Sequence, residues 1–227
     1  MRIVEPSRVS AIGYILVGGA SSRFGKDKAL VEFNGTTMIE RMRSLLMGIC
    51  MPEICLVGDP EKYAAFALEI PCVPDKWPGE GPLGGILTAL LHTQTRRRTR
   101  IACIGSGEKS KPKRNFILSC DMPFLNKEWM EEFFLTSVRS EADVVVPRSE
   151  TGLEPMCACW RTAARPIIEE QFQRGVRKVT DVFKHLKTEV LDASVWKRFD
   201  SKNRLFWNMN TPADYDGARR ILETPEA

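Results

Sequence analysis

Residues 14–28, with the sequence YILVGGASSRFGKDK, constrain the fold of this chain more than any other segment. They begin as a short apolar run typical of a buried strand, and the pair Gly18-Gly19 can then turn without the steric cost of a Cβ atom. The hydroxyl and cationic side chains that follow are Ser21, Ser22, Arg23, Lys26 and Lys28. A strand that ends in bare backbone N–H groups, small residues and cations is suited to bind a polyphosphate.

Two better-known phosphate-binding loops do not fit this segment. The G-x-x-x-x-G-K-[ST] loop has about four residues between its glycines. Here five residues separate Gly19 from Gly25, and Asp27 occupies the position of the hydroxyl residue. The dinucleotide pattern G-x-G-x-x-G is also excluded, because the strand ends in two adjacent glycines. The simpler alternative is a glycine turn followed by a solvated, charged connection, but the nearby cations favour phosphate binding.

The composition is that of an ordinary globular protein. A chain of 227 residues can form one α/β domain with a large core, and 43% hydrophobic with 27% charged residues excludes general disorder. We therefore expect a single domain over residues 1–227. The apolar run near the N-terminus is too short for a signal peptide or a membrane span, so we expect a cytoplasmic protein that does not associate with membranes.

Cysteine usage also favours a reducing compartment. The seven cysteines are scattered, lie mostly in apolar runs and form no C-x-x-C pair. The closest pair is Cys157 and Cys159, which would face the same side of a strand. We predict reduced and largely buried thiols.

The net charge of +4 is concentrated in one segment. Residues 94–114 contain eight cations and one anion, so their net charge is +7 and that of the remaining residues is −3. Apart from 101–104, the segment lacks hydrophobic periodicity, and it contains glycine, serine and proline. We predict a basic, flexible insertion at about 94–114, longer than most connections in compact domains. The alternatives are an arm that binds nucleic acid or a partner, and a hairpin at 101–104; the acidic remainder argues against a nucleic-acid-binding domain.

Beyond the first segment, strand and helix patterns alternate, as in a doubly wound sheet. Strands are predicted at residues 9–17, 54–57, 71–74, 116–119, 142–146 and 156–160, with a loop at 147–153. Helices are predicted at residues 37–49, 63–68, 82–91, 127–136, 161–172, 178–186 and 212–222. N-caps are predicted at Thr37, in a capping box with Glu40, at Asn126, and at Thr211 before Pro212. The expected fold class is α/β, a three-layer, doubly wound and mostly parallel sheet.

Two carboxylates follow predicted strands, at the edge where doubly wound sheets bind ligands. They are Asp75 and Asp121. A carboxylate at the end of a buried strand can bind Mg²⁺ together with phosphate oxygens and water. A helix cap is the structural alternative for Asp121, but Asn126 already fills that role, so we expect Asp121 to be a metal ligand.

A glycine-rich turn at residues 79–85 precedes the helix at 82–91. Pro82 suits the first helical position, whereas Gly84 and Gly85 each weaken a helix by about 1 kcal/mol relative to alanine. This cost indicates that something lies close to the backbone. A bound ligand and close packing of the helix on the sheet explain it equally well.

Near the C-terminus, Asn208 and Asn210 follow an apolar segment at 205–209. Because they are two residues apart on an extended chain, their side chains point to the same side. They either pin a turn or face the site.

Taken together, these residues resemble the molybdenum cofactor guanylyltransferases, nucleotidyltransferases with a Rossmann-like sheet. The matching pieces are LVGGASSRFGKDKAL at 16–30, PD at 74–75, GPLGGI at 81–86, CDMPF at 120–124 and NMNTP at 208–212. They occur in the family's order and span nearly the whole chain. The set is fairly specific, although related sugar nucleotidyltransferases share the first loop.

The resemblance implies that GMP is transferred from GTP to the terminal phosphate of molybdopterin or Mo-molybdopterin, with Mg²⁺ as cofactor and pyrophosphate released. The nucleotide-binding residues that it implies are Leu16, Val17, Gly18, Gly19, Lys28, Asp75, Gly81, Pro82, Leu83 and Asp121. Leu16, Val17 and Gly18 would contact the base and ribose through their backbone. Arg23 and Lys28 would hold the triphosphate, and together with Asp121, the metal ligand, they are the implied catalytic residues. Asn208 and Asn210 would lie near the metal or the pterin phosphate.

This chemistry requires little covalent help from the protein. A phosphate monoester is already a nucleophile at neutral pH, so the site mainly aligns two anions and offsets the charge that grows on pyrophosphate. We therefore predict no dedicated general base. The two histidines, His92 and His185, lie outside every motif.

Two features depart from the family's pattern. Val17 replaces the alanine of the usual Leu-Ala-Gly-Gly, beside the proposed base contact. The basic insertion separates the glycine-proline helix from the strand before Asp121, and its charge could attract an anionic pterin, a molybdoenzyme or a cofactor-donor protein.

Several other functions are compatible with parts of the sequence. A related family uses CTP instead of GTP, but it lacks the Gly-Pro-Leu pattern of residues 81–83. Sugar-phosphate nucleotidyltransferases offer a similar phosphate nucleophile. The non-enzymatic alternatives are a nucleotide sensor or cofactor chaperone and an RNA binder that acts through the basic insertion, although intact Lys28 and Asp121 favour a working enzyme.

Overall fold

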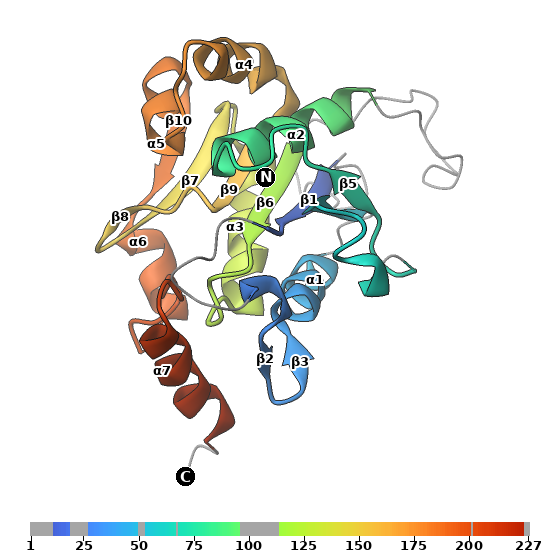
Figure 1. Cartoon of the computed structure of the whole chain (residues 1–227). Coiled ribbons are helices and arrows are strands. Elements are labelled where there is room, and N and C mark those ends of the chain that lie inside the picture. The colour runs from blue at the N-terminus through green and yellow to red at the C-terminus, as the bar shows by residue number, and fades with distance from the viewer. Residues whose placement is uncertain are drawn as a thin grey trace, which may run out of the picture.

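The structure is a computed structural model that describes residues 11–18, 27–49, 53–66, 68–95, 114–200 and 202–224. Gly19 and Arg23, two of the predicted site residues, lie outside the described residues. So do most of the basic insertion and the hairpin suggested at 101–104. Strands and helices alternate along much of the described chain, as predicted, but three successive strands within residues 144–161 follow one another without a helix (Figure 1).

The main sheet of the described chain has the strand order β10-β7-β9-β6-β1-β4-β5, with a short β8 paired to β7. The strands are β1 Ala11–Leu16, β4 Ile54–Gly58, β5 Cys72–Pro74, β6 Arg114–Ser119, β7 Val144–Ser149, β8 Gly152–Leu153, β9 Cys157–Arg161 and β10 Thr188–Leu191. β1 pairs in parallel with β4 and β6, β4 with β5, and β7 with β10. β9 is antiparallel to both β6 and β7. The sheet is therefore mostly parallel, as predicted, and the carboxyl ends of its parallel strands meet at one edge.

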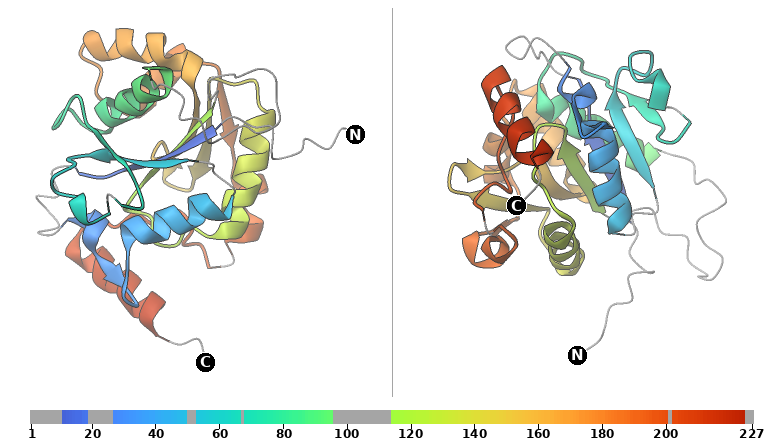
Figure 2. Two further views of the ribbon diagram at one scale, coloured as in Figure 1. Left: turned by 90° about the vertical axis from the view of Figure 1, so that its right-hand side faces the viewer. Right: turned by 90° about the horizontal axis from the view of Figure 1, so that it is seen from below.

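Helices cover both faces of the sheet and give the three predicted layers (Figure 2). On one face lie α2 Pro82–Thr95, α4 Arg165–Gln173 and α5 Val179–Val182; on the other lie α1 Met38–Gly48, α3 Lys127–Arg139, α6 Ala193–Trp196 and α7 Pro212–Glu223. Strand β1 is buried on both sides: Ile12 and Tyr14 belong to the α2-side core, and Ile15 belongs to the α1-side core. This double burial explains why β1 reads as one continuous apolar run.

The predicted N-caps form. Thr37 and Glu40 make a capping box at α1, with the Glu40 carboxylate accepting from the Thr37 N–H at 2.7 Å. Asn126 caps α3. Thr211 caps α7 in a second capping box, in which Asp214 takes the part of the usual glutamate. These local signals place three helix starts correctly because each depends only on residues within one turn.

Other elements differ from the prediction. The helix predicted at 63–68 is a single 3-10 turn, η3 Ala64–Phe66, and the one at 178–186 divides into α5 and the 3-10 turn η5 Phe183–His185. The helix at 161–172 begins as the 3-10 turn η4 Thr162–Ala164 before α4. The loop expected at 147–153 contains the end of β7 and all of β8. Pro147 is tolerated in β7 because it contributes its carbonyl, which accepts from Glu154 N–H at 2.9 Å.

Three features are absent from the predicted elements: β10, α6, and a small hairpin formed by β2 Glu32–Phe33 and β3 Thr36–Thr37. These elements contain two to four residues each, too few to show hydrophobic periodicity.

The five described cysteines are free, and Cys157 and Cys159 both lie in the α1-side core, as their spacing on a strand predicts. Within the described ranges, no helix combines the length and the apolar character that crossing a membrane requires.

Candidate active site

The predicted site begins at the carboxyl end of β1. The Val17 N–H continues the sheet by donating to the Val57 carbonyl at 3.0 Å, and Gly18 follows with a φ of +94°. A Cβ atom at Gly58 would lie 2.6 Å from the Val17 carbonyl oxygen, closer than atoms can approach. Glycine at position 58 therefore allows β1 and β4 to come together where the chain leaves the sheet.

The side chains of the proposed base-contact residues point into the protein. Val17 is buried in the α1-side core, and Leu16 packs against α2, where it lies 3.3 Å from the position of a Cβ at Gly85. The side chains of Leu16 and Val17 are therefore occupied by packing, and the backbone contacts to base and ribose that the resemblance implies stay a prediction. The Val17 N–H already donates to the Val57 carbonyl. The Val17 carbonyl and the exposed backbone of Gly18 are therefore the groups at this strand end that a ligand could contact.

Lys28 begins the 3-10 turn η2 Lys28–Leu30. Its ammonium donates to the Asn210 side-chain oxygen at 3.2 Å. Lys28 and Asn210 are 182 residues apart in sequence, so the fold joins the first predicted motif to the last one.

Asp75 lies directly after β5, with its N–H bonded to the Gly58 carbonyl at 3.0 Å. Its Oδ1 accepts from the Thr88 hydroxyl at 2.9 Å and from the Trp77 N–H at 3.1 Å. Because Thr88 is buried in α2, the carboxylate is held in a fixed orientation at the strand edge.

The glycine-rich turn before α2 supports the packing explanation. A Cβ atom at Gly84 would lie 3.1 Å from the Trp77 side chain, and one at Gly85 would press against Leu16. Gly81 and Pro82 are exposed at the start of the helix, where they can meet a ligand, whereas the Leu83 side chain is fully buried. Any contact from Leu83 to a nucleotide would therefore involve only its backbone.

Asp121 lies just beyond β6. One carboxylate oxygen accepts from the Ser119 hydroxyl, and the main-chain carbonyl accepts from the Met209 N–H at 2.8 Å. Burial raises the pKa of the Asp121 carboxyl above its ordinary value, while the bond from Ser119 and the charge of Lys28 act in the opposite direction. A cation bound here would favour the ionised carboxylate.

Glu154 is a further carboxylate at this edge, and the sequence analysis missed it. It is 5% exposed and accepts from the Ser149 hydroxyl at 2.5 Å and from the Asn208 amide at 3.5 Å. Burial raises the pKa of the Glu154 carboxyl, the charge of Asp121 raises it further, and the bonds from Ser149 and Asn208 oppose both effects.

Glu154 reaches the site because β9 runs antiparallel to its neighbours. The start of β9 therefore lies beside the end of β6, where the Ser119 N–H donates to the Met156 carbonyl at 3.0 Å. The strand predicted at 156–160 indicates that Glu154 lies near a strand end. The direction of that strand in the sheet, which decides the edge at which Glu154 lies, cannot be read from the sequence.

The two asparagines flank Asp121 through their side-chain partners. Asn208 reaches Glu154, and Asn210 reaches Lys28. The Asn208 amide also donates to the Phe206 carbonyl at 3.1 Å, so both explanations left open by the sequence apply to Asn208: a contact within its own turn and a position beside the site.

The site is an open strand edge. Two hollows of about 460 and 230 Å³ occur elsewhere among the described residues, and neither is lined by Lys28, Asp75 or Asp121. The described residues contain no cluster of three or more histidine, cysteine, aspartate or glutamate side chains that could hold a metal.

Comparison with known proteins supports the resemblance. Residues 13–190 match the family model described as the MobA-like NTP transferase domain. A protein of Carboxydothermus hydrogenoformans, described as a probable molybdenum cofactor guanylyltransferase, is 30% identical over 212 residues, covering 93% of this chain and 96% of that protein. The molybdenum cofactor guanylyltransferase of Desulfosudis oleivorans is 26% identical over 93% of this chain and 95% of its own.

A solved structure shows that the fold is shared. Molybdopterin-guanine dinucleotide biosynthesis protein A from Archaeoglobus fulgidus superposes with a TM-score of 0.71, covering 92% of this chain and 97% of that chain at 23% identity.

Proposed function

Because the chain belongs to the MobA-like NTP transferase domain family, we propose that it is a molybdenum cofactor guanylyltransferase. In the proposed reaction, GMP passes from GTP to the terminal phosphate of molybdopterin or Mo-molybdopterin, and pyrophosphate leaves. The observation that carries the proposal is that Lys28, Asn210 and Asp121 meet at one strand edge: Lys28 bonds to Asn210, and the neighbouring Met209 N–H donates to the Asp121 carbonyl. Burial raises the pKa of the Asp121 carboxyl, and the charge of Lys28 partly opposes this rise.

The nucleotide would lie across the carboxyl ends of β1, β5 and β6. The exposed backbone at Gly18 and the fixed carboxylate of Asp75 would contact the base and ribose. The Lys28 ammonium would leave the Asn210 side-chain oxygen and donate to the phosphate oxygens instead. The role of Arg23 in holding the triphosphate stays a prediction from the sequence.

The residues at this edge fit a divalent cation such as Mg²⁺. Carboxylate and amide oxygens are the ligands that Mg²⁺ prefers, and it usually takes one or two carboxylates with substrate phosphates and water completing its shell. Asp121 would hold it, with Glu154 and the side-chain oxygen of Asn208 close by. When bound, such a cation supplies neutralisation of phosphate charge and alignment of the reacting oxygens.

The chain's own residues would align the two substrates and exclude wrong geometries. An oxygen of the molybdopterin phosphate forms a bond to the α-phosphorus of GTP, the α–β phosphoanhydride bond breaks, and the electron pair leaves with pyrophosphate. Lys28 would stabilise the charge that develops on the leaving group. No proton has to be removed from a phosphate nucleophile that is already ionised at neutral pH.

The test compares GTP, CTP and ATP as donors, with Mg²⁺ and purified molybdopterin, by following pyrophosphate release. We expect release that requires both GTP and molybdopterin, and little with CTP or ATP. A preference for CTP would identify the cytidylyl-transferring alternative, and release that does not depend on the pterin would contradict the proposed acceptor.

An Asp121→Ala variant tests the proposed metal ligand. It should remain folded, because Asp121 contributes its main-chain carbonyl rather than its side chain to the bond with Met209. We expect it to lose turnover, and substantial Mg²⁺-dependent activity in this variant would contradict the assignment.

A further inference from the structure

The turn that carries Lys28 is anchored by the residue before it, Asp27. The Asp27 carboxylate accepts from the Tyr63 hydroxyl at 2.6 Å, forms an ion pair with the Lys62 ammonium at 2.6 Å, and accepts from the Ala29 N–H at 3.0 Å. Its side chain is only 13% exposed. Three donors therefore fix one carboxylate, and two of them come from a distant part of the chain.

The distant donors belong to a preformed turn after β4. Asp59 caps this turn by accepting from the Glu61 N–H at 3.0 Å. The Tyr63 side chain is 1% exposed and packs in the α1-side core, so its hydroxyl has a fixed position. Burial, followed by the bond to Asp27, raises the pKa of the Tyr63 hydroxyl, which keeps it a proton donor.

Asp27 remains charged in this environment. Burial alone would raise the pKa of its carboxyl, but the hydrogen bonds from Lys62, Tyr63 and Ala29 outweigh burial and lower it overall. Hydrogen bonds to an ionised acceptor are roughly twice as strong as those between neutral groups. The bonds to the ionised Asp27 carboxylate therefore hold this turn more firmly than bonds between neutral groups would.

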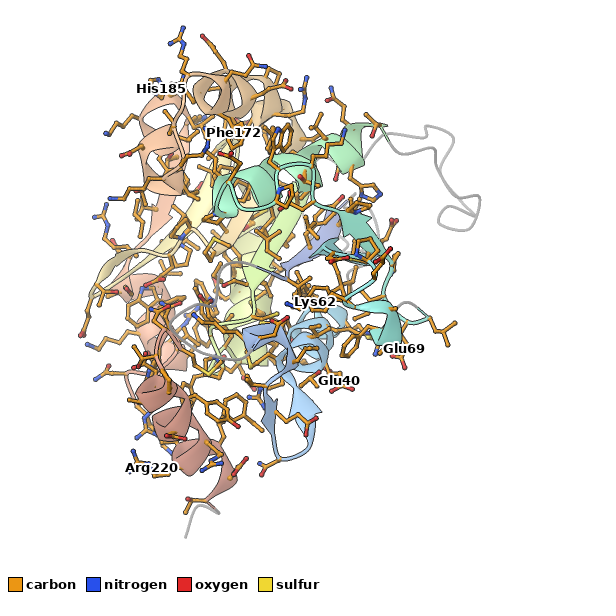
Figure 3. All side chains as sticks on the ribbon, in the orientation of Figure 1. Glu40, Lys62, Glu69, Phe172, His185 and Arg220 are labelled. Atoms are coloured by element: carbon orange, nitrogen blue, oxygen red, sulfur yellow. The ribbon has the colours of Figure 1, made fainter. Side chains whose placement is uncertain are left out.

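The side chains of Asp27 and Lys28 contact different parts of the protein. Asp27 faces Lys62 and Tyr63 after β4, whereas Lys28 reaches Asn210 in the segment before α7. Figure 3 labels Lys62, which comes from the turn after β4. The two adjacent residues at the start of the turn, Asp27 and Lys28, are therefore tied to separate loops.

We propose that Asp27 is a positioning residue for the nucleotide phosphates: held by Tyr63 and Lys62, it sets the direction in which the Lys28 side chain leaves the turn. Lys62 also balances the Asp27 charge. An unbalanced carboxylate within a Debye length of the phosphates, about 8 Å at physiological ionic strength, would repel them. The inference rests on the proposed function only in that the site binds a nucleoside triphosphate.

The test measures binding without any acceptor, by isothermal titration calorimetry with GTP, inorganic tripolyphosphate and guanosine. Asp27→Asn and Tyr63→Phe should each weaken the binding of GTP and tripolyphosphate by about tenfold, the loss expected when the charge-assisted bond from Lys28 to the phosphates is lost, and leave guanosine unchanged. Each titration is run at a temperature where thermal unfolding shows the variant to be folded.

A double-mutant cycle separates positioning from a general structural effect. Lys28→Met alone should weaken tripolyphosphate binding, and adding Asp27→Asn in that background should change the affinity less than twofold. An equal tenfold loss in both backgrounds would overturn the inference, because Asp27 would then not act through Lys28. Unchanged tripolyphosphate binding in folded Asp27→Asn and Tyr63→Phe would overturn it as well.

Two further variants keep the test decisive. Lys62 is 47% exposed, so Lys62→Gln should fold even if the buried changes do not, and we expect about threefold weaker tripolyphosphate binding from it. Tyr215→Phe is the matched control, since it removes another tyrosine hydroxyl, which donates to the Glu32 carbonyl at 3.4 Å, and should change nothing. Unchanged tripolyphosphate binding in Lys62→Gln would contradict the charge-balancing part.

The outcomes also distinguish this inference from the proposed function. If CTP binds better than GTP while tripolyphosphate shows the expected losses, the guanylyl assignment fails and the positioning role stands. If GTP supports pterin-dependent turnover but tripolyphosphate binding is insensitive to these changes, the positioning role fails alone.

Discussion

Val17 stands where the family's pattern has alanine, and the structure gives its extra methyl groups a packing role. One of them lies 2.7 Å from the position of a Cβ at Gly58, and the side chain belongs to the α1-side core. The valine therefore fills the space that Gly58 leaves open.

Replacing Val17 with alanine should lower stability and spare nucleotide binding. We expect a loss of about 1–2 kcal/mol in the free energy of unfolding, measured with urea, because two buried methyl groups are removed. The dissociation constant of GTP should change less than twofold. A tenfold change in GTP affinity without a loss of stability would show instead that Val17 shapes the base site.

Glu154→Gln tests whether the carboxylate missed by the sequence analysis supports cation binding. Removing a negative charge close to Asp121 should raise the Mg²⁺ concentration needed for half-maximal rate, by about tenfold for a loss of about 1.4 kcal/mol. GTP affinity measured without acceptor should change little. Ser149→Ala is the comparison variant: it keeps the carboxyl group but removes a bond that lowers the pKa of Glu154, so we expect a smaller effect than that of Glu154→Gln.

The Asp27 anchor predicts a specific pH dependence of stability. The pKa of Asp27 in the folded protein is below its ordinary value of 3.8, so its contribution is present above that value and is lost as the pH falls through the folded pKa. Asp27→Asn should therefore cost about 1–2 kcal/mol at pH 7. The difference between wild type and variant in urea unfolding should shrink at pH 3, and a difference that grows on acidification would contradict this sign.

Among individual residues, the sequence identified those that follow strands along the chain. Asp75 and Asp121 occupy strand ends, and Lys28 lies close to Asp121, as the motifs predicted. Glu154 was missed because its proximity to Asp121 depends on the antiparallel pairing of β9. Tyr63 and Lys62 were missed because nothing in their own segment indicates a carboxylate partner 36 and 35 residues earlier.

Helix α7 links a local capping signal to the site. Asp214 at its third position accepts from the Thr211 N–H at 2.7 Å and from the Asn210 N–H at 2.9 Å. The cap therefore also fixes the backbone of Asn210, the partner of Lys28. Asp214→Ala should cost about 1 kcal/mol of stability, as loss of a cap does, and should slow turnover several-fold.

Asp216→Ala is the matched control for this helix. Asp216 is an exposed acidic residue of α7 whose carboxylate lies 3.9 Å from Arg219 and makes no bond to the cap. We expect thermal unfolding and turnover of Asp216→Ala to match wild type. Equal effects of the two substitutions would show that the charge of α7, rather than its cap, matters.

Among elements, those with local signals were predicted well. α1, α3 and α7 begin at the caps read from the sequence, and the strands that line both cores read as apolar runs. The elements that were missed or shortened depend on tertiary partners. β10, for example, is only partly buried and is defined by its pairing with β7, so its own residues carry little signal.

At the scale of the whole molecule, the described residues form two apolar cores, one on each face of a single main sheet. The single domain over residues 1–227 stays a prediction. A hydrogen bond joins the two residues that flank the basic insertion, Thr93 and Asn115. Thr93 in α2 donates to Asn115 in β6 at 2.5 Å, inside a buried network that includes the Tyr14 hydroxyl. The fold on either side therefore does not depend on the inserted residues to hold its ends together.

Replacing residues 96–113 with a short glycine-serine linker should leave the fold and the rate intact. We expect kcat/KM to change less than twofold at both 50 and 300 mM salt (about 14 and 6 Å in Debye length), as for a passive, solvated segment. A rate that falls only at low salt would show that the basic charges attract an anionic substrate or partner. Loss of folding would contradict the closure by Thr93 and Asn115.

The sequence by itself determined the kind of sheet, the positions of the main helices and the identity of the residues at its strand ends. Turn chemistry, helix caps and apolar runs act over a few residues, so they can be read without knowing the fold. The tertiary structure alone decided which strand ends meet. The reversed direction of β9 brings Glu154 beside Asp121, the turn after β4 holds Asp27, and the segment before α7 meets Lys28. These contacts join residues that are far apart in sequence, and only the packing of the whole sheet and its two layers of helices can place them.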